Sequence, residues 1–175
     1  WPDITGVAKV GYTLTATPGA WPNGTTDLLY GWYADGNWFA FTQTGRVTLG
    51  AGQLGKRISV QVWGVKPSAP GTFEVKDGNV TGKVVAGTLK ASTPKISGTA
   101  KVGKKLTAKP GAWTSGTKFT FRWYANGKAI KKATKSTFKV TKAQRGKKIT
   151  VKVTGTKAGY TTVTKTSAKT KTVKR

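Results

Sequence analysis

The side chains that could perform acid–base or nucleophilic chemistry are few in this chain of 175 residues. It contains no Cys and no His, which removes the thiol nucleophile, the usual general base and the commonest metal ligands. Glu74 and Asp77 are the nearest approach to a carboxylate pair, but the Asp77-Gly78 dipeptide predicts a turn between strands. We therefore expect no enzymatic activity, no catalytic residue, no metal site and no cofactor. All the acids lie before position 78: Asp3, Asp27, Asp35, Glu74 and Asp77.

Lysine dominates the second half of the chain. From position 88 onward there are 24 Lys and Arg residues and no acid, and a segment this cationic favours an anionic partner. Lys outnumbers Arg 26 to 5, and Lys acts as a hydrated point charge where Arg would recognise phosphates and bases in a bidentate manner. The pattern predicts salt-sensitive adhesion to teichoic acids, acidic polysaccharides or anionic lipid headgroups, with only non-specific binding of nucleic acid in vitro. The candidate anion-binding residues are Lys128, Lys131, Lys132, Lys147, Lys148, Lys152, Lys165, Lys169 and Lys171.

Two weaker patterns bear on these lysines. Lys blocks the pairing of exposed strand edges, which accounts for a handful of them but not for 24 cations without an acid. Alternation along residues 164–172 predicts a strand with Lys165, Lys169 and Lys171 on one face.

The elements that position these side chains follow from an internal repeat. The segment 4–21 returns as 96–113 with 13 of 18 residues identical, and shorter matches follow at 32–36 with 123–127 and at 55–62 with 146–153. Residues present in both copies are expected to serve the fold. Residues present in one copy are candidates for a specific task.

Both copies alternate apolar and polar residues with a period of 2, which is the pattern of strands. Pro-Gly, Asp-Gly and Asn-Gly pairs separate these segments and predict tight turns, as at Asp35-Gly36 and Asn126-Gly127. Short strands separated by frequent turns are typical of a β-sandwich. We predict an all-β fold of two tandem antiparallel Ig-like β-sandwiches, residues 3–85 and 95–173, joined by a linker at 86–94.

Aromatic residues found only in the first copy are candidates for carbohydrate binding. Trp38 and Trp63 correspond to Ala129 and Thr154, and strand alternation points both, together with Tyr33, away from the core. The three would form an exposed row that stacks on sugar rings, with Gln61 bonding hydroxyls. The alternative, which the residues leave open, is packing against the second copy or another part of the protein. The shared Trp32 and Trp123 are expected in the cores.

These features resemble the bacterial immunoglobulin-like repeats of secreted and cell-surface proteins. The resemblance rests on the opening Ile-x-Gly-x-x-x-Val-Gly, the Pro-Gly-x-Trp turn, the mid-domain Trp-Tyr and the strand Gly-Lys-x-Ile-x-Val-x-Val, and it covers nearly the whole chain. The first copy departs from the pattern with an insertion at 67–71. Such repeats serve as spacers, adhesins and accessories that bind carbohydrate or cell wall, so the resemblance implies the fold more specifically than the function.

We expect a non-catalytic binding module of a secreted or surface bacterial protein that attaches it to polysaccharide or an anionic cell-wall polymer, for example as the C-terminal accessory part of a hydrolase. The alternative is a structural spacer or stalk with no ligand of its own. The chain lacks Met even at position 1 and has no apolar run of transmembrane length. It is therefore expected to be a monomeric part of a longer multidomain protein, without a transmembrane segment.

Overall fold

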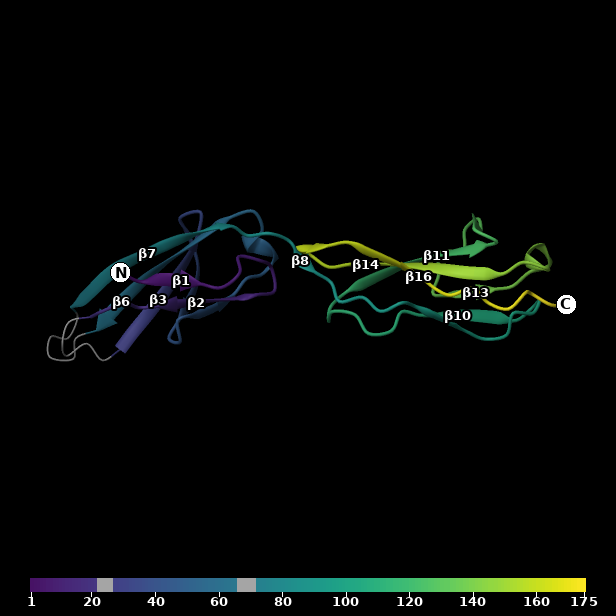
Figure 1. The fold of residues 1–175 in the computed structure, drawn as a ribbon, viewed down its shortest axis with the longest axis horizontal. Coiled ribbons are helices and arrows are strands. Elements are labelled where there is room, and N and C mark those ends of the chain that lie inside the picture. Colours follow the sequence, from purple (N-terminus) through teal and green to yellow (C-terminus); the bar gives the residue numbers. More distant parts are fainter. Residues whose placement is uncertain (22–26, 66–71) are drawn as a thin grey trace. The chain divides into compact units, whose positions relative to one another are not determined.

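The computed structural model describes residues 1–21, 27–65 and 72–175, so the insertion at 67–71 lies outside the described residues. The chain divides into two compact units, Trp1–Gly87 and Thr88–Arg175. The short strand β8 (Gly87–Thr88) spans the boundary between them. Each unit is built from antiparallel strands arranged in two layers (Figure 1).

Unit 1 contains a three-stranded and a four-stranded sheet. The smaller sheet has the order β1-β2-β5, and the larger has the order β4-β3-β6-β7. A short 3₁₀ helix, Ala51–Gln53, leads into β6. The strand bounds are β1 (Asp3–Thr5), β2 (Thr13–Thr17), β3 (Asp27–Ala34), β4 (Asn37–Thr42), β5 (Arg46–Thr48), β6 (Arg57–Val65) and β7 (Phe73–Lys83).

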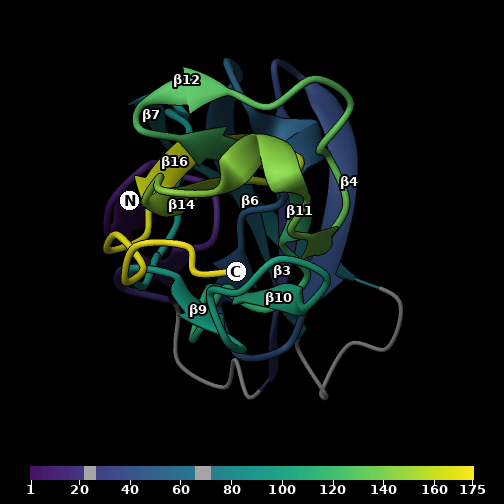
Figure 2. The same ribbon diagram turned by 90° about the vertical axis from the view of Figure 1, so that its right-hand side faces the viewer.

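Unit 2 repeats this arrangement. Its smaller sheet has the order β13-β10-β9 and its larger sheet the order β12-β11-β14-β16. Both views place β10 across from β14 and β16 (Figures 1 and 2). A second 3₁₀ helix, Lys142–Gln144, precedes β14. The strand bounds are β9 (Lys95–Ser97), β10 (Lys105–Lys109), β11 (Lys118–Ala125), β12 (Lys128–Ala129), β13 (Thr137–Lys139), β14 (Ile149–Thr156), β15 (Tyr160–Thr161) and β16 (Val163–Thr166).

The strand order is the same in the two units, and every pairing within these four sheets is antiparallel. A three-stranded sheet packed on a four-stranded sheet with this connectivity is the immunoglobulin-like arrangement. Both units are immunoglobulin-like β-sandwiches. The predicted fold class is thereby confirmed.

The two cores contain equivalent residues. Trp32 and Trp123 are fully buried, as the shared pattern predicts. Each indole N–H is satisfied: Trp32 donates to Thr42 Oγ1 at 3.2 Å, and Trp123 donates to the carbonyl of Lys135 at 2.8 Å. A buried tryptophan requires such a partner because an unpaired polar group in the core is costly. These two side chains are therefore components of the fold.

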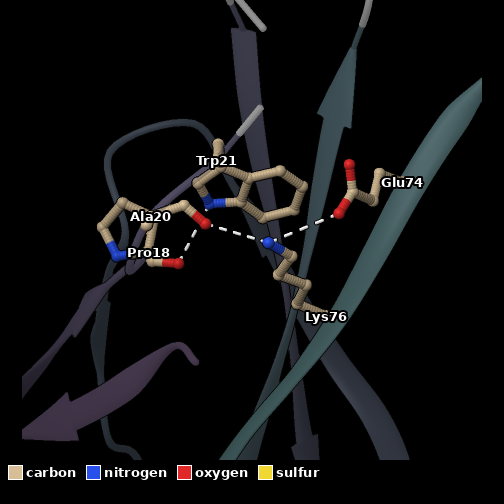
Figure 3. Close-up of polar contacts among 5 residues, drawn as sticks. All are labelled: Pro18, Ala20, Trp21, Glu74 and Lys76. Carbon is tan, nitrogen blue, oxygen red and sulfur yellow. Dashed lines mark hydrogen bonds and ion pairs between the residues drawn. The ribbon is translucent and has the colours of Figure 1, made fainter. Parts of the chain in front are cut away.

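The Pro-Gly-Ala-Trp segment of each unit forms a corner held by its own tryptophan. Trp21 donates its indole N–H to the carbonyl of Pro18, and Trp113 donates in the same way to Pro110. In unit 1 this corner is fastened to β7 (Figure 3): Lys76 Nζ lies 4.6 Å from the Trp21 ring centroid and donates to the carbonyl of Ala20 at 2.9 Å. The same ammonium group lies 3.3 Å from a Glu74 carboxylate oxygen. Glu74 is thus engaged in a structural ion pair.

The Asp35-Gly36 and Asn126-Gly127 pairs form equivalent hairpin turns in the two units. Asp35 and Asn126 have positive φ values of 48° and 46°, the left-handed conformation that a tight hairpin turn requires. Asp35 Oδ1 accepts from the amide of Arg57, and Asn126 Oδ1 accepts from the amide of Lys148. An amide replaces a carboxylate without loss of this bond, so the charge of Asp35 is not required at the turn.

The segment expected as a linker, 86–94, has contacts within unit 2 from Lys90 onward. Leu89 is buried, Lys90 exchanges hydrogen bonds with Thr114, and the amide of Ser92 donates to the carbonyl of Ala112. The domain limits 3–85 and 95–173 remain predictions.

Two local expectations from the sequence are wrong. Asp77-Gly78 does not form a turn, because β7 runs through it with a shift in register against β6. Residues 164–172 do not form one strand, because β16 ends at Thr166 and Ser167 is buried. Both errors arise at the same place in the two units, opposite the middle of β6 or β14, where β7 shifts its register and β16 ends.

Candidate binding faces on the two units

The outer face of the larger sheet in unit 1 is rich in exposed apolar side chains. Pairing places Trp38 beside Tyr33, Phe41 beside Gly31, and Trp63 between Leu29 and Val75. These residues alternate with the buried Trp32, Val60 and Val62, so their side chains lie on the side of the sheet away from the core. Trp38 is 62% exposed, and the other strongly exposed members are Phe41, Phe73, Val75 and Val80.

The three aromatic residues singled out from the sequence lie on this face but do not form a single row. Tyr33 and Trp38 are direct partners across β3 and β4. Trp63 lies further along the sheet, where its ring packs over Gly31 and contacts Phe41 at 5.8 Å between centroids. Trp63 is consequently half-buried, whereas Trp38 is the open ring of the group.

Phe41 is an exposed aromatic residue of this face that alternation along the sequence does not predict. A register shift at Trp32/Tyr33 leaves Phe39 as an extra residue in β4, and a bulge of this kind resets the alternation beyond it. Simple alternation from Trp38 places residues 40 and 42 outward, but the structure turns Phe41 outward instead. Its partner Gly31 was the available signal, because a glycine inside a strand often marks a bulge.

A shallow depression of about 330 Å³ lies beside Tyr33, on the side of β3 away from Trp38. The Tyr33 hydroxyl donates to Gln61 Oε1 at 2.8 Å, which fixes the amide of Gln61 within the depression. Asp77 is exposed beside it, and its carboxylate makes no hydrogen bond or ion pair with another described residue. The arrangement offers open apolar rings next to an oriented amide and a carboxylate. The remaining lining residues are Gly36, Ser59, Val60, Gly78 and Val80.

The same face of unit 2 has a different character. Arg122 and Lys152 are paired on β11 and β14, and Thr154 lies opposite Thr120. Thr154 occupies the place of Trp63, and Thr164 on β16 occupies that of Val75. The fold thus forms without aromatic side chains at these positions.

All the lysines proposed for anion binding are exposed, but they do not form one patch. Lys148, Lys152 and Lys169 line a depression of about 440 Å³ on the larger sheet. A second depression, of about 530 Å³, is lined by Lys128, Lys131 and Lys147. Lys171 lines a further one together with Lys148, Lys169 and Lys174. Two of the nine, Lys132 and Lys165, line none of these.

Lys165 differs in direction from Lys152. It pairs with the inward-facing Val153, whereas Lys152 pairs with Thr166 on the outer face. The expected grouping of Lys165 with Lys169 and Lys171 on one strand face is therefore wrong, because the strand ends before Lys169.

Within the part of the chain that the structure describes, no three acidic side chains lie together in a way that could hold a metal ion. In the same residues, no helix has the length and apolar character needed to cross a membrane. Burial raises the pKa of the Tyr30 hydroxyl above its ordinary value of 10.0. Tyr30 lies on the inner side of β3, away from the depression on the outer face of unit 1.

Models of protein families and curated proteins give no match to this chain. Solved structures with similar architecture include the amphioxus IgVJ-C2 molecule, with 16% identity and a TM-score of 0.34 over 85% of this chain and 91% of that one. The tandem Ig repeats of Dlar have 14% identity and a TM-score of 0.31, covering 99% and 94%. The fibronectin(III)-like modules of CbhA from Clostridium thermocellum have 16% identity and a TM-score of 0.29, covering 95% and 92%. The assignment of the fold rests on the strand order and pairing described above.

Proposed function

We propose that this chain is a non-catalytic binding module that attaches a secreted or surface protein to polysaccharide through the outer sheet face of unit 1. The observation that supports this most directly is the open indole of Trp38 beside the Tyr33–Gln61 hydrogen bond. An exposed group of large apolar residues on a soluble domain usually marks an interaction surface. Flat rings flanked by fixed polar groups suit a sugar, which has an apolar ring face and polar hydroxyls.

The comparison between the units separates this role from the needs of the fold. Unit 2 has the same strands with Ala129 and Thr154 in place of Trp38 and Trp63. Exposing the ring of Trp38 to water has no benefit for folding. A ligand that covers the exposed ring removes its apolar surface from water, which favours binding.

The lysines of unit 2 provide a second attachment, to anionic polymers, in this proposal. Unit 2 contains no acid that could neutralise them internally. Binding through many such charges releases counterions and weakens as salt is raised. Retention by unit 1 through stacking should depend on salt much less.

The test is co-sedimentation of the intact chain with insoluble neutral glycans and with purified cell wall. The wild-type chain should appear in the pellet at moderate salt, and Trp38→Ala should shift it to the supernatant. Trp1→Ala is the matched control, because Trp1 is a 90% exposed indole that lies outside the sheet. A chain that stays in the supernatant with every glycan would instead be a spacer with no ligand of its own.

A further inference from the structure

The depressions on the two outer faces occupy the same place in the fold. In unit 1 Tyr33 pairs with Ser59, and Gln61 pairs with Asp77. In unit 2 Tyr124 pairs with Thr150, and Lys152 pairs with Thr166. A hairpin glycine, Gly36 or Gly127, closes one end of each depression. The two are thus versions of one site with different side chains.

The wall of this site is formed where the last strand departs from regular pairing, by a register shift in β7 and by the end of β16. In unit 2, Ser167 Oγ accepts from the amide of Val151 at 3.0 Å, and Thr170 Oγ1 accepts from the amide of Ile149 at 3.0 Å. These hydroxyls take the place of backbone carbonyls along β14 and hold residues 167–170 against it. In unit 1, Thr81 Oγ1 accepts from the amide of Ile58 in the same manner. Interruptions of this kind redirect side chains beside binding sites, and here the redirected residue is Lys169.

The charge of the site is changed completely between the units. Gln61 and Asp77 are replaced by Lys152 and Thr166, and the wall residue Val80 is replaced by Lys169. Lys148 adds a third ammonium group to the lining, and Lys152 Nζ lies 5.1 Å from the centroid of Tyr124. Three cations with no acid anywhere in unit 2 repel one another. An anion in the depression relieves this repulsion.

We infer that this depression, lined by Lys148, Lys152 and Lys169, is a defined binding site for the anionic substituent of an acidic glycan. This inference rests on the proposed function and replaces diffuse attraction with one location. The hydroxyls of Thr150 and Thr166 and the amide of Asn126 in the lining offer hydrogen bonds to sugar hydroxyls. Its lining contains no Arg, and Lys152 lies over its one aromatic ring. The site therefore lacks the open stacking surfaces and forked donors that proteins use for single-stranded nucleic acid.

The site continues into a neighbouring depression. Lys148 and Lys169 also line the one that contains Lys171 and Lys174. A glycan with an acidic group on successive sugars meets further cations in this direction. Binding should therefore strengthen from a single acidic sugar to an oligomer.

The experiment measures the affinity of the intact chain for three probes by calorimetry at low and moderate salt. The probes are hexagalacturonate, phosphorylated maltohexaose and hexathymidylate, which separate carboxylate, sugar phosphate and nucleic acid. Lys148→Gln/Lys152→Gln/Lys169→Gln is compared with Lys105→Gln/Lys109→Gln/Lys139→Gln. The control removes the same charge from exposed positions on β10 and β13 of the opposite sheet.

The first variant should weaken binding of an acidic glycan about ten-fold or more, while the control changes it by about two-fold at most, because only the first removes direct contacts. Equal losses in the two variants would overturn the inference in favour of diffuse attraction. Tighter binding of hexathymidylate than of either glycan, with the same sensitivity to the first variant, would assign the site to nucleic acid and also overturn it. Absence of binding of all three probes by the wild-type chain would overturn it as well.

Introducing the side chains of the unit 2 site into unit 1 tests the inference by a gain of binding, which a loss of stability cannot produce. Gln61→Lys/Asp77→Thr/Val80→Lys gives unit 1 two of the cations of unit 2 at equivalent places and replaces the carboxylate opposite position 61, and it should create a second binding site for the acidic glycan. Sedimentation of Lys148→Gln/Lys152→Gln/Lys169→Gln with neutral glycan reports separately on binding by unit 1. If that sedimentation is normal while the two triple Lys→Gln variants lose equal affinity for the acidic glycan, the inference is wrong and the proposed function stands.

Discussion

The ring of Trp63 lies over Gly31, so near that a Cβ atom at position 31 would overlap Cη2 and Cζ3 of the indole. The glycine lets a large ring lie flat on the sheet, and Phe41 then borders it on β4. Part of the aromatic face of unit 1 is therefore packed in advance of any ligand. Trp38, by contrast, remains open.

Gly31→Ala should disturb unit 1 through this contact. The added methyl group forces Trp63 away from the strand, and overpacking of this kind costs about 1–3 kcal/mol. Thermal unfolding and the accessibility of Trp63 to a fluorescence quencher are the measurements. Gly36→Ala is a useful comparison for steric overlap, because no atom lies within 4 Å of its added Cβ, although its positive φ of 78° adds a separate strain. An unchanged Trp63 environment in Gly31→Ala would contradict the packing described.

Trp38→Ala and Trp63→Thr should separate binding from stability. Trp38 is mostly exposed, so its loss should change the free energy of unfolding by less than about 0.5 kcal/mol. Its loss should weaken glycan binding by about 1–2 kcal/mol, the scale of an interface contact. Trp63→Thr introduces the residue of unit 2, and it should cost stability by about 1–2 kcal/mol because the ring is half-buried. Denaturant unfolding measures the change in stability of each variant, and binding isotherms measure the change in its affinity for the glycan. Equal effects of the two on stability would refute this division.

Tyr30 should make unit 1 sensitive to alkaline pH. Because burial raises its pKa in the folded state, the neutral phenol is favoured there relative to the unfolded chain. This contribution to stability is complete below the unfolded pKa of about 10 and is lost as the pH rises through the folded pKa. Tyr30→Phe, which introduces the Phe121 of unit 2, should remove this part of the decline above about pH 10. Denaturant unfolding at several pH values measures it, with the exposed Tyr12→Phe as control. The same decline in both variants would exclude Tyr30 as its source.

Lys76→Met should loosen the corner that carries Trp21. The substitution keeps an unbranched, largely apolar side chain but removes the ammonium group from the indole and from the carbonyl of Ala20. A cation–π contact at a partly exposed site is worth about 0.5–1 kcal/mol, and the half-exposed ion pair with Glu74 adds little. The free energy of unfolding should fall by about 1 kcal/mol. Lys83→Met, at an exposed position on the same strand, should leave it unchanged.

The internal repeat explains why the fold could be predicted in detail. Ile58, Val60 and Val62 alternate with polar residues as Ile149, Val151 and Val153 do, and all six are buried. Because the alternation with a period of 2 is the same in both copies, it determines which side chains of these strands face the core. The burial of Trp32 and Trp123 follows from the same argument.

The candidate sites were less predictable because both depend on interruptions in strands. An Asp-Gly pair such as Asp77-Gly78 looks the same in a hairpin turn and in a strand with a register shift. The extra residue Phe39 likewise reverses the alternation that would have revealed Phe41. The residues of each depression come from neighbouring strands, and their grouping requires the register that these interruptions alter.

The absence of acidic side chains in unit 2 has a consequence for its behaviour in acid. Acid denaturation proceeds mainly by protonation of carboxylates that are paired in the folded state, or by charging of buried histidines. Residues 88–175 contain neither acid nor His, so no side chain there takes up a proton as the pH falls from neutral. The free energy of unfolding of unit 2 should therefore be nearly constant from neutral pH into strong acid. A carboxylate ligand bound to unit 2 would dissociate in acid because the ligand, not the protein, becomes protonated.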